Sequence, residues 1–241
     1  MDNQICDPVT GFCTPAALTS LIENTLDTNQ NPLEIVYIGD PMCSWCWGIA
    51  EELKALREHY VAEGNTFKIV VGGLRPGGGD QWNDQFKNFL KHHWKEVNQR
   101  SGQPFGNKLF DLEQFNYDTE PACRAVVAAR PFVGEKELAF FEAVQRRFYV
   151  ENEDPKEVDF YKPICEKFDI DFDAFSKAFL DQASIKATQD EFVLNRSWGV
   201  RGYPSVVVKT KDQMHLIANG YSTFEQMRGR VEAIREEVVT N

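Results

Sequence analysis

Two cysteines placed between a strand-like run and a helix-like run constrain this chain more than any other feature. Cys43 and Cys46 enclose Ser44 and Trp45, directly after the apolar run at residues 33–38. A thiol at the start of a helix lies near unpaired backbone N–H groups and the positive end of the helix dipole, which lower its pKa. A second thiol one turn later can close a disulfide with it. The pattern therefore favours thiol–disulfide chemistry, with Cys43 as the nucleophile and Cys46 as the resolving thiol.

The first part of the chain has the pattern of a strand, a helix and a strand. Apolar runs predict buried strands at 33–39 and 67–71, and helical spacing predicts a helix at 43–63 between them. This order predicts two parallel strands joined by a right-handed crossover. From about residue 80 to 182 almost every periodic segment is helical, so a helical block interrupts the α/β pattern.

Strand character returns near the C-terminus. After a helix at about 183–197, apolar runs predict strands at 205–208 and 214–218, and their short separation predicts an antiparallel hairpin. The segment from Ser222 to Glu225 has the form of a capping box and predicts a terminal helix that reaches about Val238.

Removal of the helical block leaves the order β-α-β-α-β-β-α, which is that of a thioredoxin fold. The predicted fold class is therefore α/β, a thioredoxin-like fold with a large helical insertion. The expected parts are a thioredoxin-like domain at residues 33–79 and 183–241, an inserted helical domain at 80–182, and an N-terminal extension at 1–32.

Charge and hydropathy exclude several classes of partner. The formal net charge is −11, from 26 basic and 37 acidic residues, so nucleic acid and anionic membrane surfaces would be repelled. No run approaches the roughly 18–20 apolar residues that a membrane helix needs. The first residues lack the basic start and apolar core of a secretory signal, which predicts a cytoplasmic protein. Because cytoplasmic thiols are kept reduced, a pair of cysteines there is expected to be catalytic or metal-binding rather than a structural disulfide.

Metal binding is the alternative use of such a dithiol. A structural zinc site needs about four ligands, and the chain has no second pair of cysteines with this spacing. His92 and His93 lie in an amphipathic surface pattern. The redox interpretation is therefore favoured, and no metal is expected.

Two segments carry a resemblance to a known family. Residues 40–48 read Asp-Pro-Met-Cys-Ser-Trp-Cys-Trp-Gly, and residues 202–205 read Gly-Tyr-Pro-Ser before a predicted strand. Together with the helical insertion, they resemble the DsbA-like branch of the thioredoxin superfamily, and more narrowly its FrnE-like predicted disulfide isomerases, over nearly all of residues 33–241. The resemblance implies a protein thiol–disulfide oxidoreductase or isomerase with Cys43 and Cys46 as its catalytic pair.

The resemblance gives Tyr203 and Pro204 the place of the family's cis-proline loop. A cis peptide bond there would expose the Tyr203 backbone to a substrate strand and set the Pro204 ring against the sulfurs. An ordinary trans proline at the start of an edge strand is the alternative. Around the dithiol, Met42, Trp45 and Trp47 form an apolar surround in which Trp45 is expected to contact substrate and Trp47 to pack in the core.

The residues that tune the dithiol depart from those of strongly oxidising family members. Those members carry a histidine between the cysteines, whereas this chain has Ser44 and Trp45, which supply no cation. The Ser44 hydroxyl could assist the helix terminus, and Asp40 would raise the pKa of Cys43. We therefore expect a less acidic Cys43 and a less oxidising couple than in those members.

A glycine-rich segment, residues 72–79, follows the second predicted strand. It lacks the G-x-G-x-x-G and G-K-[ST] arrangements, so nucleotide binding is not expected. Parallel strands bring their carboxyl ends to one edge of a sheet, which places Arg75 on the same side as Cys43. Arg75 is a candidate cation for the thiolate or for a substrate carboxylate; a solvated side chain at a hinge into the insertion fits equally well.

The remaining four cysteines are weaker candidates for a catalytic role. Cys6 and Cys13 bracket a turn and could form an accessory disulfide of modest stabilisation, exchange with the main dithiol, or stay reduced. Cys123 and Cys165 lie in helical, partly apolar settings and are expected to be small buried side chains.

Three functions fit these features. The first is an oxidoreductase or isomerase for protein or peptide thiols and disulfides, served by a small thiol or a thioredoxin-type redox partner. It would hold no bound cofactor, and glutathione is the candidate small thiol. The second, suggested by relatives with the same fold, is a glutathione-dependent isomerase or kappa-type transferase, against which the presence of both thiols argues. The third is a redox-regulated chaperone or partner-binding module that holds clients with its helical block. The direction of electron flow depends on reduction potentials rather than on the motif.

Overall fold

The computed structural model divides the chain into two compact units, Met1–Pro32 and Leu33–Asn241. It describes residues 4–6, 13–15, 32–211 and 213–240. Every motif singled out in the sequence, apart from Cys6 and Cys13, falls in the second unit.

The first unit is described in two short strands. β1 (Gln4–Cys6) and β2 (Cys13–Pro15) pair antiparallel, with Cys6 opposite Cys13. The side chains of both cysteines lie outside the described part of the structure, so the accessory disulfide predicted for them stays a prediction.

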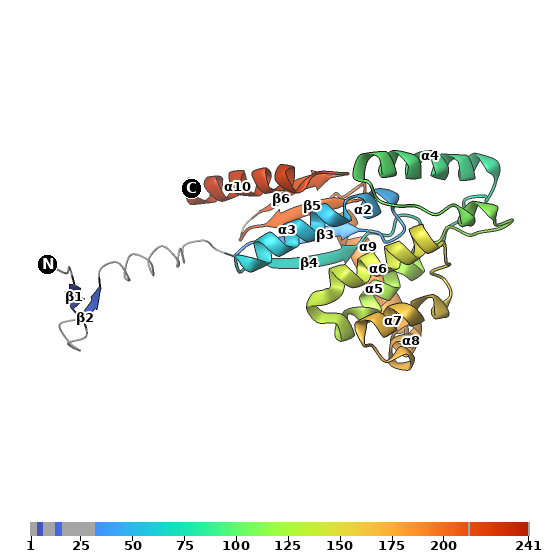
Figure 1. The fold of residues 1–241 in the computed structure, drawn as a ribbon, viewed down its shortest axis with the longest axis horizontal. Coiled ribbons are helices and arrows are strands. Elements are labelled where there is room, and N and C mark those ends of the chain that lie inside the picture. Colours follow the sequence, from blue (N-terminus) through green and yellow to red (C-terminus); the bar gives the residue numbers. More distant parts are fainter. Residues whose placement is uncertain (1–3, 7–12, 16–31, 212, 241) are drawn as a thin grey trace. The chain divides into compact units, whose positions relative to one another are not determined.

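The second unit is built on a mixed sheet with the strand order β4-β3-β5-β6 (Figure 1). β3 (Glu34–Gly39) pairs parallel with β4 (Thr66–Val71) and antiparallel with β5 (Ser205–Lys209), which in turn pairs antiparallel with β6 (Met214–Asn219). These strands lie where the apolar runs predict them, and the β-α-β and hairpin connections are as expected. β3 takes a central place because it is apolar and buried along most of its length.

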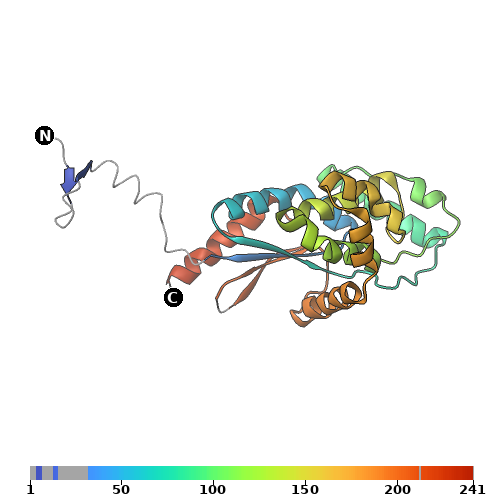
Figure 2. The same cartoon turned by 90° about the horizontal axis from the view of Figure 1, so that it is seen from below.

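Helices pack against both faces of this sheet. α3 (Ala50–Ala62) and α10 (Phe224–Thr240) lie on one face, and α9 (Gln182–Ser197) lies toward the other face beside β4 (Figure 2). Glu191 of α9 accepts a hydrogen bond from the Val71 N–H at 2.8 Å. A backbone donor at the outer edge of β4 is therefore paired inside the protein.

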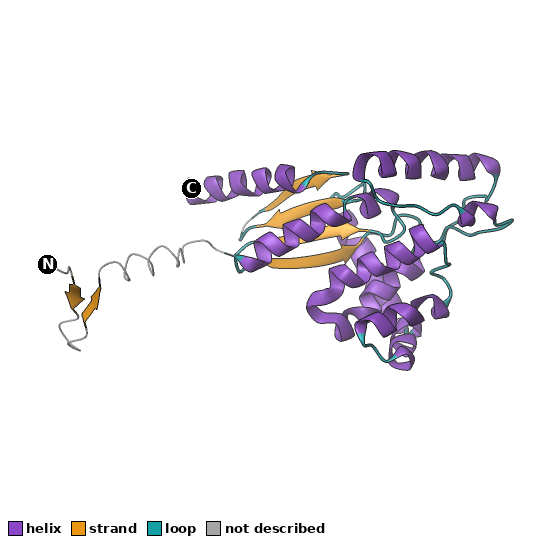
Figure 3. Ribbon diagram, in the orientation of Figure 1, coloured by secondary structure: helices purple, strands orange, loops and turns teal. Residues whose placement is uncertain are grey.

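The segment between β4 and α9 is helical, as predicted (Figure 3). It shares the hydrophobic core of the sheet. Its elements are α4 (Asp84–Ser101), η1 (Lys108–Asp111), α5 (Glu120–Val133), η2 (Gly134–Lys136), α6 (Glu137–Arg146), η3 (Arg147–Glu151), η4 (Val158–Tyr161), α7 (Lys162–Phe168) and α8 (Phe172–Leu180). α5 is the central helix, because it contacts β4, α6, α8 and α9. The fold is thus the predicted α/β thioredoxin-like fold with a large helical insertion, and the domain boundaries at residues 80 and 182 stay a prediction.

One predicted helix is two helices in the structure. The stretch 43–63 forms α2 (Ser44–Gly48) and α3, separated by Ile49 with φ −85° and ψ −2°. Next to the break, α4 packs closely on α2, since a Cβ atom on Gly48 would crowd the Val97 side chain. Helical spacing in the sequence does not report this neighbour.

The terminal helix α10 begins one residue later than the predicted capping box. Thr223, rather than Ser222, precedes the helix, and its hydroxyl oxygen accepts from the Gln226 N–H at 3.3 Å. The Gln226 side chain accepts from the Thr223 N–H at 3.0 Å. Gln226 therefore takes the place predicted for Glu225.

Candidate active site

Cys43 lies at the N-terminus of α2, as the sequence predicts. It directly precedes the helix and has extended backbone angles of φ −88° and ψ 117°. Its thiol donates a hydrogen bond to the Tyr203 carbonyl oxygen at 3.4 Å. The peptide bond between Tyr203 and Pro204 is cis, as predicted. The fold thus brings together a thiol and a proline loop that are 160 residues apart in the chain.

Cys46 is the inner of the two sulfurs. It is 0% exposed, whereas Cys43 is 5% exposed, so Cys43 is the more accessible thiol, as expected. Both cysteines are free thiols in this structure, and the Asp40 N–H donates to the Cys46 sulfur at 3.5 Å. Burial raises the pKa of Cys46 well above its ordinary value, and the neighbouring Cys43 raises it further. Cys46 therefore stays protonated at neutral pH.

Asp40 is a buried carboxyl that links the dithiol turn to the inserted block. One of its oxygens accepts from the Met42 N–H at 2.8 Å. The other accepts from the Leu74 N–H at 2.6 Å and from the Thr119 hydroxyl at 2.7 Å. Burial raises the pKa of Asp40, and these donors oppose the rise. Besides the tuning role that the sequence predicts for it, Asp40 thus holds three segments together.

Tyr203 fastens the proline loop to the segment that follows β4. Its hydroxyl donates to the Gly72 carbonyl at 2.5 Å and lies 3.0 Å from the Asn195 side-chain oxygen. Burial and the nearby Asp40 raise the pKa of Tyr203 to about 12, so the phenol remains a donor. Position 72 requires glycine because a Cβ atom would overlap the Tyr203 ring. The side chain of Tyr203 therefore anchors the loop while its carbonyl faces Cys43.

Three further tyrosines surround the dithiol, and the sequence motifs do not point to them: Tyr37, Tyr117 and Tyr149. Burial raises the pKa of all three, and the charge of Cys43 adds to the rise in each case. The Tyr117 hydroxyl donates to the Met42 carbonyl at 2.9 Å and so supports the dithiol turn. The sequence does indicate one feature of Tyr37. Gly39 follows it by two residues in a buried strand, and a glycine there leaves room for the tyrosine ring.

Apolar side chains enclose the sulfurs, as predicted. Met42 and Trp47 are buried, and the Trp47 indole N–H donates to the Pro104 carbonyl at 3.0 Å. Trp47 is therefore a core residue, in line with the sequence interpretation. Trp45 is half-buried, with its ring centre 6.2 Å from that of Tyr221. Of the two, Trp45 is the more exposed, and its contact with substrate stays a prediction.

The polar residues expected to act on the thiolate lie in different settings. Ser44 is the first residue of α2 and is half-buried. Arg75 contacts neither sulfur, because its guanidinium pairs with Asp80 and lies 5.1 Å from the centre of the Phe86 ring. Its position agrees with a hinge into the insertion, although the side chain is paired rather than solvated.

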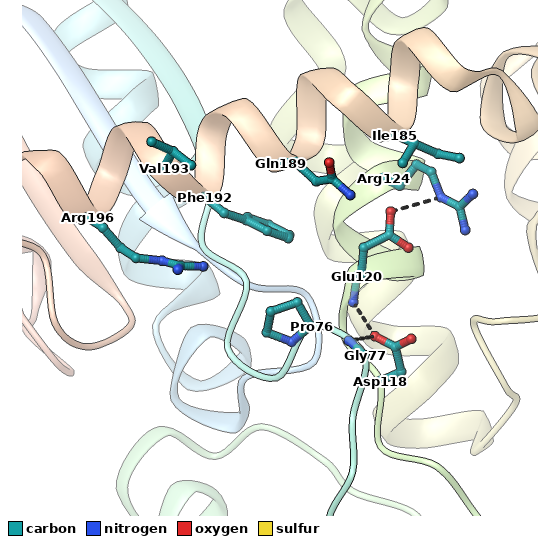
Figure 4. A pocket seen from close by; sticks show the side chains of 10 residues that line it. All are labelled: Pro76, Gly77, Asp118, Glu120, Arg124, Ile185, Gln189, Phe192, Val193 and Arg196. Carbon is teal, nitrogen blue, oxygen red and sulfur yellow. Dashed lines mark hydrogen bonds and ion pairs between the residues drawn. The ribbon is translucent and has the colours of Figure 1, made fainter.

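A pocket of about 530 Å³ lies beside the glycine-rich segment, between α5 and α9 (Figure 4). Phe192 and Arg196 of α9 lie on its α9 wall, and Pro76 lies on the facing loop. Glu120 and Arg124 of α5 form an ion pair at 3.2 Å on the other side. No cysteine lines the pocket, so it is a neighbour of the dithiol site rather than a part of it.

Cys123 and Cys165 are fully buried free thiols, as predicted. Burial raises the pKa of Cys123 well above its ordinary value and that of Cys165 to about 11. The charge of Asp40 adds to the rise in the pKa of Cys123, so this thiol lies near the Asp40 carboxyl.

A metal site needs a cluster of ligating side chains, and a membrane-spanning helix needs a long apolar run. Across 32–211 and 213–240, no cluster of three or more His, Cys, Asp or Glu side chains could hold a metal ion. None of the helices in that part is long and apolar enough to cross a membrane.

The geometry and the sequence agree with a known family. Residues 34–232 match the model of the DSBA-like thioredoxin domain. The chain belongs to this family. The matched range includes Cys43, Cys46 and the proline loop, and the fold is that of a DsbA-like thiol–disulfide oxidoreductase.

Solved structures of this family share the fold. The crystal structure titled as that of a "putative protein disulfide isomerase" from Nitrosomonas europaea is 34% identical, with a TM-score of 0.79, and the match covers 86% of this chain and 99% of that one. The cytosolic disulfide reductase DsbM from Pseudomonas aeruginosa, also solved with GSH, is 23% identical. Its TM-score is 0.65, and the match covers 83% of this chain and 97% of that one.

A similarity to curated proteins extends over part of their length. The ClpXP adapter protein SpxH of Bacillus subtilis is 24% identical over 178 residues, which are 73% of this chain. SpxH of Shouchella clausii is 24% identical over 208 residues, or 84% of this chain. The chain spans 58% and 65% of the length of these two relatives, less than two thirds in each case.

Proposed function

We propose that this protein is a thiol–disulfide oxidoreductase that acts on protein or peptide substrates through Cys43 and Cys46. The observation that carries the proposal is the Cys43 sulfur, which lies at the start of α2 and 3.4 Å from the Tyr203 carbonyl oxygen. A backbone carbonyl beside a nucleophilic sulfur can pair with the N–H of an extended substrate segment and so align the substrate sulfur for attack.

The chemistry that this geometry supports consists of two exchanges. The Cys43 thiolate attacks a substrate disulfide, a Cys43–substrate bond forms, and the other substrate sulfur leaves as a thiolate. Cys46 then loses its proton and attacks the Cys43 sulfur, which closes the Cys43–Cys46 bond and releases the substrate reduced. The reverse sequence transfers a disulfide to a dithiol substrate.

The partners belong to the same proposal. Protein disulfides are the proposed substrates, in an isomerase or reductase reaction in the cytoplasm, and glutathione is the proposed small thiol. Two solved relatives support it by their titles, one a "putative protein disulfide isomerase" and the other a cytosolic disulfide reductase solved with GSH. Arg100 adds support, because it is exposed, lies 5.4 Å from the centre of the Tyr221 ring next to Trp45, and has no carboxylate partner among the described residues. It could receive a carboxylate of glutathione.

A trapping experiment tests the proposed roles of the two thiols. With a fluorescent disulfide peptide, Cys46→Ser should accumulate a mixed disulfide at Cys43 that mass spectrometry can locate, because the resolving thiol is missing. Cys43→Ser should form no adduct and turn nothing over. Cys165→Ala is the control, since it removes a buried thiol of the insertion and should retain turnover. Peptide turnover by Cys43→Ser would contradict the proposal.

A partner-binding role is the second candidate, because the curated relatives that match 73% and 84% of the chain are named ClpXP adapter proteins. The double variant Cys43→Ala/Cys46→Ala separates the two functions. If it still binds a partner or protects an aggregating client as well as the wild type does, binding is independent of the thiols and this second role is favoured. If both activities are lost with the thiols, the oxidoreductase is favoured.

A further inference from the structure

A buried hydroxyl without a partner lies beside the resolving thiol. Tyr37 of β3 is fully buried, and its hydroxyl has no hydrogen-bond partner among the residues that the structure describes. A buried phenol normally finds a partner, because an unpaired buried donor costs about 1–3 kcal/mol. Packing alone does not explain why this position carries a hydroxyl.

The position of this hydroxyl relates it to Cys46. The Tyr37 ring folds back over Gly39, where a Cβ atom would overlap the hydroxyl. The next residue, Asp40, donates its N–H to the Cys46 sulfur at 3.5 Å. After burial, the charge of Cys46 is accordingly the largest influence that raises the pKa of Tyr37. Phe141 of α6 packs edge-on against the Tyr37 ring at 5.5 Å and holds it in this orientation.

We propose that the Tyr37 hydroxyl donates a hydrogen bond to the Cys46 sulfur when that sulfur becomes a thiolate. The inference rests on the proposed function, and it concerns the resolving step. There the Cys46 S–H proton is lost, the Cys46–Cys43 bond forms, the Cys43–substrate bond breaks, and the departing substrate sulfur takes up a proton. As negative charge develops on the Cys46 sulfur, two groups donate hydrogen bonds to it: the Tyr37 O–H and the Asp40 N–H. Tyr37 does not take the proton itself, because burial keeps its pKa well above the ordinary value.

Among the groups around Cys46, Tyr37 is the side chain whose hydroxyl is available to donate to the sulfur. Cys43 shares the turn and raises the pKa of Cys46, whereas Tyr37 lowers it. The charge of Cys46 contributes to the raised pKa of Tyr203, but the Tyr203 hydroxyl already donates to the Gly72 carbonyl at 2.5 Å. The carboxyl of Asp40 accepts hydrogen bonds from the Met42 N–H, the Leu74 N–H and the Thr119 hydroxyl instead. The α6 residue that packs against the Tyr37 ring, Phe141, is apolar.

Tyr37→Phe tests the proposal, because it removes the hydroxyl and keeps the ring. A fluorescent peptide is first joined to Cys43 of the full-length protein as a mixed disulfide, and its release is then followed as a function of pH. The wild-type rate should rise with pH as Cys46 loses its proton. In Tyr37→Phe the profile should move about one unit to higher pH, and release at neutral pH should slow roughly tenfold, as expected when a thiolate loses a charge-assisted hydrogen bond.

Two comparisons separate this role from a structural one. Tyr161→Phe is the matched control, since Tyr161 is also fully buried and its hydroxyl donates to the Pro155 carbonyl at 2.7 Å within the insertion. It should leave the release profile unchanged. Incorporation of 3,5-difluorotyrosine at position 37 keeps the ring and supplies a stronger donor, so the profile should move to lower pH.

The possible outcomes distinguish this inference from the function on which it rests. An unshifted pH profile in Tyr37→Phe, with an active wild type, overturns the role of Tyr37 and leaves the oxidoreductase intact. Equal slowing of the first exchange and of release at every pH would make Tyr37 structural only and also overturns it. No release from the wild-type adduct at any pH contradicts the proposed function itself. Should Tyr37→Phe fail to fold, an unshifted profile for the difluorotyrosine protein is the outcome that decides against the inference.

Discussion

Position 39 has to be glycine because the ring of Tyr37 occupies the space that a side chain would need. Gly39→Ala should therefore destabilise the protein by about 1–3 kcal/mol, since the ring must shift within a packed core. Urea unfolding measures the change. Gly229→Ala is the control: nothing lies within contact distance of a new Cβ atom on this exposed helical glycine, so it should stabilise by about 0.5–1 kcal/mol. Effects of the same sign and size at both positions would contradict this account.

The carboxyl of Asp40 makes stability depend on pH in a definite direction. Burial raises its folded pKa above the ordinary 3.8, so the folded chain binds this proton more tightly than the unfolded chain does. The stability of the wild type relative to Asp40→Asn should thus be greatest below 3.8 and should fall as the pH rises toward the folded pKa. Urea unfolding of both proteins over a pH series measures this difference, and a difference that grows with pH would show that the pKa is lowered instead.

The parts of the site that could be predicted are those whose chemistry depends on residue type and spacing. Cys43 and Cys46 meet that condition, and so does the proline loop once the dithiol is recognised. Thr119 and Asn195 do not, because their roles consist of hydrogen bonds across long stretches of chain, from Thr119 to Asp40 and from Asn195 to the carbonyls of Val71 and Gly72. Such contacts exist only after the helical block has folded against the sheet.

At the scale of elements, α9 protects an edge of the sheet through one carboxylate. Glu191 accepts the Val71 N–H and pairs with Arg130 of α5. Glu191→Ala should destabilise by roughly 1–3 kcal/mol, because the buried Val71 N–H loses its partner and the largely buried Arg130 keeps only Glu137 as a carboxylate partner. Asp190→Ala is the matched control, since its ion pair with Lys186 is exposed and should change stability by less than about 0.5 kcal/mol. Equal losses of stability for the two variants in urea unfolding would show that Glu191 does not stabilise the edge of β4.

The elements themselves were predictable to different degrees. The strands agree with their apolar runs to within a residue or so, because a buried strand has to be apolar along its length. The break at Ile49 and the true cap of α10 were not predictable, since one accompanies the close packing of α4 on α2 and the other depends on which of two hydroxyls meets a helix N–H.

At the scale of the whole molecule, residues 33–241 form a compact unit, and the family match lies inside it. A protein truncated to 33–241 should therefore fold, unfold in a single cooperative transition, and release a mixed-disulfide peptide at the rate of the full chain. Circular dichroism during urea unfolding and the release assay measure these properties. An insoluble or unfolded fragment would show that residues 1–32 complete the fold.

The order of elements made the fold class predictable, because few architectures accommodate a parallel pair, a helical block and a terminal hairpin. What the order could not reveal is that the helical block and the sheet share one hydrophobic core, with α5 packed on both β4 and α9. That continuity arises from tertiary packing of faces that look alike in the sequence.

The depth of the reactive sulfur has a consequence for what can reach it. Cys43 keeps 5% of its surface and lies beneath a backbone carbonyl of the proline loop. So little exposed surface favours thin, pliable reactants over rigid ones. If the proposed function holds, unfolded polypeptide segments and small thiols should therefore react with Cys43 faster than the disulfides of folded proteins do.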